Sequence, residues 1–122
     1  MSGNNYLLDT NILLYALKGI DVVRPYFDIS PSISVVTEIE ILGVKDPLAD
    51  DLNIRETIIE YCQVIAFTIA IKKKTIELKR EIKLAIPDAL IAATAIERGL
   101  TLVTEDKGFK KIKGLSLILI EV

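Results

Sequence analysis

The sequence predicts an α/β protein with three layers, in which helices cover both faces of a parallel sheet of about five short strands. Short apolar runs alternate with helical patterns along the whole chain, and right-handed crossovers between parallel strands place the intervening helices on the faces of the sheet. The chain has 122 residues, of which 51% are hydrophobic. This size and composition fit one folded domain spanning residues 1–122.

The expected elements follow in order from the N-terminus. Apolar runs predict strands at 6–8, 33–36, 64–67, 100–103 and 115–120. Apolar spacing and capping signals predict helices at 11–17, 37–43, 47–61, 68–84 and 87–98. Pro25 and Pro31 mark a connecting region, and 105–113 is a polar loop or short helix. Asp46 followed by Pro47 is typical of an N-cap and first helical position. Helix 87–98 is apolar or small at nearly every interior position, which predicts burial on more than one side.

The composition excludes several kinds of chemistry. The chain has no histidine and one cysteine, Cys62, so it has no His/Cys zinc site, no histidine-based catalysis and no intramolecular disulfide. Any metal must be bound by oxygen. No apolar run reaches the roughly 18 residues of a membrane span, and Met1–Asn5 lacks the features of a secretory signal. We therefore expect a soluble cytoplasmic protein.

Charge is distributed unevenly along the chain. Residues 1–61 carry 4 Lys and Arg against 10 Asp and Glu, whereas residues 62–122 carry 11 against 7. This pattern is typical of an acidic site beside a basic surface, although solvated helix faces of different charge would also produce it. The basic candidates for contact with nucleic-acid phosphates cluster in 68–84: Lys72, Lys73, Lys74, Lys79, Arg80 and Lys83.

Acidic residues follow the predicted strands at their carboxyl ends. In an open parallel sheet this edge holds the functional crevice. The candidates are Asp9, Glu40, Asp88 and Asp106, with Glu105 beside the last. Asp88 lies in the first turn of helix 87–98, where small Ala92 and Ala95 follow on its face.

Each acid also has a purely structural explanation. Asp9 fits an N-cap, and Thr37 with Glu40 fits a capping box. Asp88 suits the dipole of its helix, and Asp106 suits a turn. These explanations do not account for all four acids at one edge. Carboxylates about 4 Å apart repel by roughly 4 kcal/mol at an effective dielectric of ~20, so a shared site needs a cation. Mg²⁺ or Mn²⁺ suits oxygen ligands and activates water toward a phosphodiester.

Four segments together resemble a PIN domain, and more narrowly the VapC-like ribonuclease toxins of type II toxin–antitoxin pairs. They are LLDTNIL at 7–13, SVVTEIEILG at 34–43, IPDALIAATA at 86–95 and LVTED at 102–106. The resemblance implies a Mg²⁺- or Mn²⁺-dependent endoribonuclease that leaves 5′-phosphate and 3′-hydroxyl ends.

The resemblance also assigns roles to particular residues. It implies that Asp9, Glu40 and Asp88 are the invariant metal-binding and catalytic acids and that Asp106 is a more variable fourth acid. Thr10 and Asn11 belong to the first motif, and Thr104 orients the site through its hydroxyl. Many relatives carry Asp where this chain has Gly108, which leaves Glu105 open as a substitute for Asp106. The spacing favours Glu40 over Glu38.

The resemblance further implies a homodimer and a cognate antitoxin protein. Apolar side chains of the early helices either contribute to such an interface or belong to the core: Leu13, Leu14, Leu17, Ile41 and Leu42. Two other functions remain open. One is a catalytically silent PIN-like module that binds RNA or protein. The other is an aspartate-nucleophile phosphatase, which is disfavoured because Asn11 occupies the position where such enzymes carry a second acid.

Overall fold

A computed structural model describes residues 5–122, and the expectation about the secretory signal therefore lies largely outside the described residues. A central sheet of five parallel strands has the order β3-β2-β1-β4-β5. The strands are β1 (Tyr6–Leu8), β2 (Ser32–Ser34), β3 (Gln63–Ile65), β4 (Thr101–Thr104) and β5 (Leu117–Leu119). This sheet confirms the predicted fold class.

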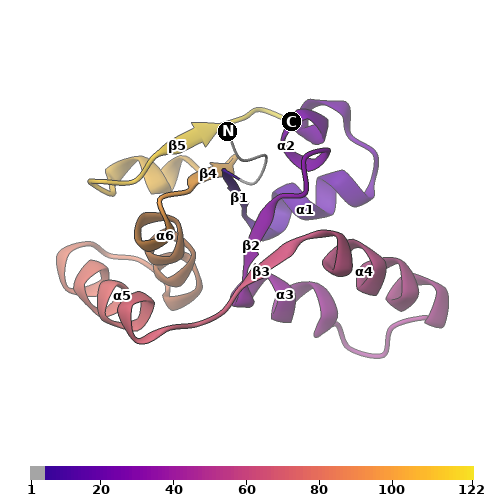
Figure 1. The fold of residues 1–122 in the computed structure, drawn as a ribbon, viewed down its shortest axis with the longest axis horizontal. Helices are drawn as coiled ribbons and strands as arrows, with labels where there is room; N and C mark the ends of the chain where they lie inside the picture. The colour runs from indigo at the N-terminus through magenta and orange to yellow at the C-terminus, as the bar shows by residue number, and fades with distance from the viewer. Residues whose placement is uncertain (1–4) are drawn as a thin grey trace.

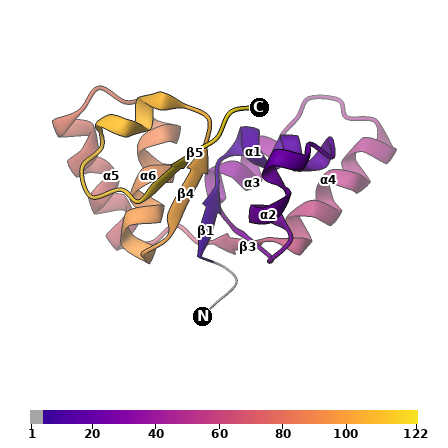
Figure 2. The same ribbon diagram turned by 90° about the horizontal axis from the view of Figure 1, so that it is seen from above.

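Helices form a layer on each face of the sheet (Figures 1 and 2). One layer contains α5 (Ile69–Glu81) and α6 (Ile86–Arg98). The other contains α1 (Thr10–Leu17), α2 (Arg24–Phe27), α3 (Val35–Leu42) and α4 (Ala49–Tyr61). Short 3₁₀ helices η1 (Asp21–Val23) and η2 (Lys107–Lys111) complete the chain.

Successive side chains of the strands enter different cores. Leu7 and Leu102 pack with α5 and α6, whereas Leu8 and Val103 pack with α1, α3 and α4. Alternate residues of a strand point to opposite faces, and both faces here are covered by helices. This arrangement explains why the strands read as continuous apolar runs.

The second strand and its helix begin earlier than predicted. Strand β2 ends at Ser34 and α3 begins at Val35, so Thr37 is already helical. The Ser34 side chain is the N-cap and accepts a hydrogen bond from the Thr37 amide at 3.3 Å. The capping box predicted for Thr37 and Glu40 is therefore wrong. β-Branched residues at 35–37 looked like strand, but the serine cap starts the helix before them.

The start of α4 is also later than predicted. Asp46 has a φ of 49°, in the left-handed region, whereas an N-cap residue is normally extended. The extended residue before the helix is Leu48, which offers no side-chain cap. Asp46 and Pro47 therefore belong to the preceding turn. The end of α5 also differs from the prediction. This helix ends at Glu81 instead of residue 84, because Ile82 is extended.

Leu13 and Ile41 are fully buried in the core and cannot contribute to an interface. Leu14, Leu17 and Leu42 are partly buried beside them. Helix α6 is buried around most of its circumference, as predicted, from Ala89 to Ala95. Within residues 5–122, no helix is both long and apolar enough to cross a bilayer.

The strand order reverses direction between β1 and β4. From β1 the chain proceeds outward through β2 to β3, and then returns to the far side of β1 to form β4 and β5. Ligands of open α/β sheets bind at such a switch point, outside the carboxyl ends of the strands. The residues that follow β1 and β4 there are Asp9 and Glu105.

Candidate active site at the β1–β4 switch point

Asp9 lies at the centre of the switch point and is only 8% exposed. Its amide donates to the carbonyl of Val103 at 3.2 Å, which ties it to β4. One carboxylate oxygen, Oδ1, accepts a hydrogen bond from the Ile12 amide at 3.1 Å and so caps α1. The other oxygen, Oδ2, accepts from the Thr104 hydroxyl. Asp9 is thus an N-cap, as its structural explanation predicted, and it also lies among the other acids.

Thr104 links Asp9 to the acids that follow β4. Its side chain is fully buried. While the hydroxyl donates to Asp9, it accepts a hydrogen bond from the Asp106 amide at 3.0 Å. Asp106 Oδ1 in turn accepts from the Gly108 amide at 2.8 Å and caps η2. One threonine therefore fixes the separation of Asp9 and the 105–106 turn.

Glu105 is held on the α1 side of the site. The hydroxyl of Tyr15 donates a hydrogen bond to Glu105 Oε1. This contact, together with partial burial and the charges of Glu105 and Asp9, raises the pKa of the Tyr15 phenol. Asp106 occupies the other side, close enough that its charge acts on both Asp9 and Asp88. Asp106 also lines a hollow together with Asp88, whereas Glu105 does not.

Glu40 reaches the site from α3. Its Oε1 accepts a hydrogen bond of 2.5 Å from the Thr10 hydroxyl, and Thr10 lies 3.1 Å from the hydroxyl of Thr37. These contacts hold the exposed Glu40 side chain against the first turn of α1. Glu38 has no hydrogen bond or ion pair within the described chain.

Asp88 comes from the opposite helical layer, in the first turn of α6. The chain leaves α6 to enter β4, so the first turn of α6 lies at the carboxyl edge of the sheet. Ala92 and Ala95, which follow Asp88 on its helix face, are fully buried. Acids from a strand end and from helices on both faces therefore converge on one edge.

The charges of neighbouring acids act on Asp9 and on Asp88. Burial, followed by the charges of Asp106 and Glu105, raises the pKa of Asp9, although the hydrogen bonds from Thr104 and Ile12 oppose this rise. Burial also raises the pKa of Asp88, and the charges of Asp106 and Glu40 add to the rise. Ionising these groups together is unfavourable without a cation.

No protein cation balances this charge within residues 5–122. The ion pairs of that range join Arg24 to Asp21, Arg55 to Asp51 and Lys74 to Glu77. In the same range, no group of three acidic or cysteine side chains is close enough to form a ready metal cage. The donor set nevertheless suits Mg²⁺, because all donors are oxygens and their mutual repulsion is what a hard cation would relieve.

Some predicted residues lie outside this network. Asn11 is exposed and has no side-chain hydrogen bond in the described chain. Lys72 and Lys73 are exposed near the start of α5, about 10 Å along the helix axis from Lys79 at 1.5 Å per residue. Lys79 and Lys83 lie nearer the site: Lys79 Nζ donates to the carbonyl of Leu84, just before α6. Arg80 is exposed on the last turn of α5.

Other residues near the acids were not anticipated from the sequence. Tyr15 and Thr37 contact site residues through long-range pairing that no local pattern indicates. Lys111 lines a hollow of about 200 Å³ beside Asp88 and Asp106. Cys62, by contrast, is buried, which raises the pKa of its thiol to about 12 and makes it unsuitable as a nucleophile.

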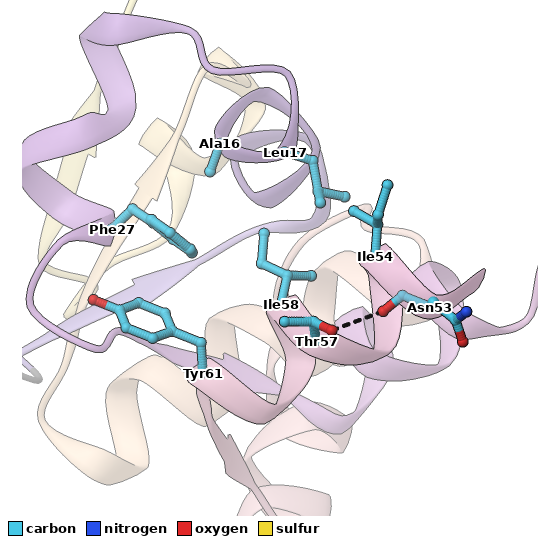
Figure 3. A pocket seen from close by; sticks show the side chains of 8 residues that line it. All are labelled: Ala16, Leu17, Phe27, Asn53, Ile54, Thr57, Ile58 and Tyr61. Carbon is cyan, nitrogen blue, oxygen red and sulfur yellow. Dashed lines mark hydrogen bonds between the residues drawn. The ribbon is translucent and has the colours of Figure 1, made fainter. Parts of the chain in front are cut away.

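An apolar cavity of about 490 Å³ lies between α1, α2 and α4 (Figure 3). Ala16 and Leu17 of α1, Phe27 of α2 and Ile58 of α4 form much of its wall. None of the candidate acids lines it. The cavity lies at the C-terminal end of α1, whereas Asp9 caps the N-terminal end.

The fold and these acids correspond to a known family. The sequence profile of the PIN domain family matches residues 6–115, which is most of the chain. The chain therefore belongs to the PIN domain family. A comparison with curated protein sequences finds no significant match.

Several solved toxin–antitoxin structures contain similar chains. A chain of DNA-bound VapBC2 from Rickettsia felis is 25% identical, with a TM-score of 0.81 over 95% of this chain and 98% of the other. A chain of DNA-bound VapBC from Salmonella typhimurium is 27% identical, with a TM-score of 0.81 over 94% and 97%. A chain of a toxin–antitoxin complex from Klebsiella pneumoniae is 28% identical, with a TM-score of 0.77 over 93% of this chain and 95% of the other. Within the PIN family, the chain is thus VapC-like.

Proposed function

We propose that this protein is a Mg²⁺- or Mn²⁺-dependent endoribonuclease that hydrolyses RNA phosphodiester bonds. The observation that carries the proposal is the convergence of Asp9, Glu40, Asp88 and Asp106 at the β1–β4 switch point without a cationic partner in the described chain. Membership of the PIN family and similarity to toxin–antitoxin complexes support the same chemistry.

The four acids are the proposed metal-binding and catalytic residues. A bound divalent cation would polarise a phosphoryl oxygen and lower the pKa of a bound water. The other residues of the chain position the acids. Thr104 holds Asp9 and the Asp106 backbone, Thr10 holds Glu40, and the Gly108 amide holds Asp106.

A role in a toxin–antitoxin pair is part of the proposal. The similar chains occur in toxin–antitoxin complexes from three bacteria, two of them VapBC complexes, which supports a cognate antitoxin as the partner of this chain. We also propose a homodimer. Exposed apolar side chains such as Ile39 and Ile86, at 62% and 63% exposure, give such assemblies apolar surface to bury.

The aspartate-nucleophile alternative is disfavoured because Asn11 occupies the position where such enzymes carry a second acid. A catalytically silent PIN module is the second candidate. It should show little Mn²⁺-dependent thermal shift, and an activity measurement also separates it from a nuclease.

The variant Asp9→Asn tests the proposal. Asparagine keeps an oxygen to cap α1 but removes the metal-binding charge, so we expect the fold to survive and RNA cleavage with Mg²⁺ or Mn²⁺ to fall by more than about 100-fold. Glu38→Gln is the matched control, because it removes a nearby acid outside the network, and it should cleave like the wild type. Cleavage by Asp9→Asn at the wild-type rate, with an unchanged circular dichroism spectrum, would refute the nuclease assignment.

A further inference from the structure

A small hollow adjoins the acids on the side of α6. It has a volume of about 200 Å³, and Asp88 and Asp106 form one part of its lining. Lys83 and Lys111 form another part. Lys83 belongs to the connection between α5 and α6, and Lys111 is the last residue of η2. The hollow is therefore the place where the acidic site meets positive charge.

Hydrogen bonds hold the basic side of the hollow in place. Lys111 Nζ donates to the carbonyl of Lys83 at 3.0 Å, which joins η2 to the connection before α6. Lys79 Nζ donates to the carbonyl of Leu84 in the same connection. An ammonium group has three donors, so Lys111 is fixed at the rim with two donors left for a ligand.

The lysines do not neutralise the neighbouring acids. Within residues 5–122, neither Lys83 nor Lys111 forms an ion pair with a carboxylate. Both side chains are exposed, so an anion from solution can reach them. Opposite charges thus line one hollow without pairing, which leaves the cations available to a ligand.

Gly108 lines the hollow beside Asp106. A Cβ atom at this position would lie 3.0 Å from Asp106 Oδ1, so any side chain would push against that carboxylate. An acidic side chain there would also place a negative charge beside the lysines. Glycine instead exposes its backbone to the hollow and donates its amide to Asp106 at 2.8 Å.

We infer that this hollow binds the backbone phosphate next to the phosphate being cleaved, with Lys83 and Lys111 as its cationic contacts. The identity of the ligand as RNA rests on the proposed function. A metal at the acids would compensate the charge of the cleaved phosphate, but the adjacent phosphate of the strand needs a separate cation. The volume is below that of a typical small-molecule pocket and far too small for a protein helix, whereas it suits a phosphate with part of its ribose.

The test compares two double variants with the same change in charge. Lys83→Gln with Lys111→Gln removes the cations of the hollow. Lys110→Gln with Lys113→Gln is the control, since these exposed lysines lie on η2 and just after it but do not line the hollow. Binding of a fluorescent single-stranded oligoribonucleotide is measured by anisotropy at several salt concentrations, and cleavage of the same RNA is followed with Mn²⁺.

We expect the hollow variant to bind about tenfold more weakly and to raise KM by a similar factor with little change in kcat. The magnitude of its slope of log K against log salt should fall by about 0.7, because the contact to one phosphate of a single strand is lost. The control should change much less. Lys111→Arg, which keeps the charge, should restore most of the binding.

Equal weakening by the two double variants would mean diffuse attraction and would overturn the inference. Wild-type KM in the hollow variant would also overturn it while leaving the nuclease proposal intact. If the wild type fails to cleave RNA but its binding depends on the hollow lysines, the nuclease proposal fails and the phosphate site stands. If the hollow variant loses as much affinity for polyglutamate as for RNA, the hollow is a general anion site and the assignment to RNA is wrong.

Discussion

Thr104 shows how a single hydroxyl determines the geometry of the acidic site. It is fully buried, donates to Asp9 and accepts from the Asp106 amide. Its removal would leave the Asp106 amide without its acceptor and the buried Asp9 carboxylate without one donor. Thr104 does not itself belong to the proposed ligand set, so we regard it as a positioning residue.

We expect Thr104→Val to lower stability by about 1–2 kcal/mol and to raise the Mn²⁺ concentration that gives half-maximal cleavage by about tenfold. Urea denaturation and a metal titration of cleavage measure the two effects. Thr104→Ser keeps the hydroxyl and should recover most of the metal dependence. Thr94→Val is the control, because Thr94 is equally buried but bonds only the Leu90 carbonyl within α6. A normal metal dependence in Thr104→Val would contradict the positioning role.

At the scale of elements, α3 illustrates how a cap positions a functional side chain. Ser34 starts the helix, and the start of the helix determines which side chains face α1. Thr37 and Glu40 are one turn apart on this face, and both lie against Thr10. A helix that began at Thr37, as the sequence pattern suggested, would have made Glu40 a capping residue directed at its own backbone.

The variant Ser34→Ala should therefore have two effects. Loss of the cap should cost about 1 kcal/mol of stability, and looser anchoring of Glu40 should reduce RNA cleavage several-fold. Thr68→Ala removes the equivalent cap of α5, where Thr68 Oγ1 accepts from the Ile71 amide at 3.1 Å, far from the acids in the chain. It should lose comparable stability by thermal denaturation but retain cleavage. Equal losses of activity in the two variants would mean that reduced stability alone explains the lower RNA cleavage.

Local patterns predicted where the strands and longer helices lie along the chain, because continuous apolar runs and small-residue spacing reflect burial on both faces of the sheet. They misplaced element ends where two local signals competed, as at 34–37 and 46–49. Local patterns also identified the acids as candidate site residues, because the ends of strands can be predicted from sequence. They missed Tyr15, Thr37 and Lys111, whose contacts join residues 27 to 90 positions apart and depend on strand order. Strand order leaves no local signal.

At the scale of the whole molecule, the acidic edge is a source of instability that a cation would remove. Burial and the neighbouring charges raise the pKa values of Asp9 and Asp88, which means that their ionised forms are held at a cost. The cost arises because four separate parts of the fold bring carboxylates together: the end of β1, α3, α6 and the turn after β4. A binding site that opposes stability is common where function requires like charges to lie close together.

This balance between carboxylate repulsion and cation binding predicts two opposite effects of Asp88→Asn on stability. Without divalent metal it should melt at a higher temperature than the wild type, because it removes one of the repelling carboxylates while α6 keeps its other first-turn contacts. With Mn²⁺ at about 100 times Kd, the wild type should gain about 2.7 kcal/mol, whereas the variant should gain far less. Differential scanning fluorimetry with and without Mn²⁺ measures both, with Glu38→Gln as the control for loss of an acid elsewhere. If Mn²⁺ shifts Asp88→Asn as much as the wild type, the cation binds elsewhere, and the convergence of the acids is not a metal site.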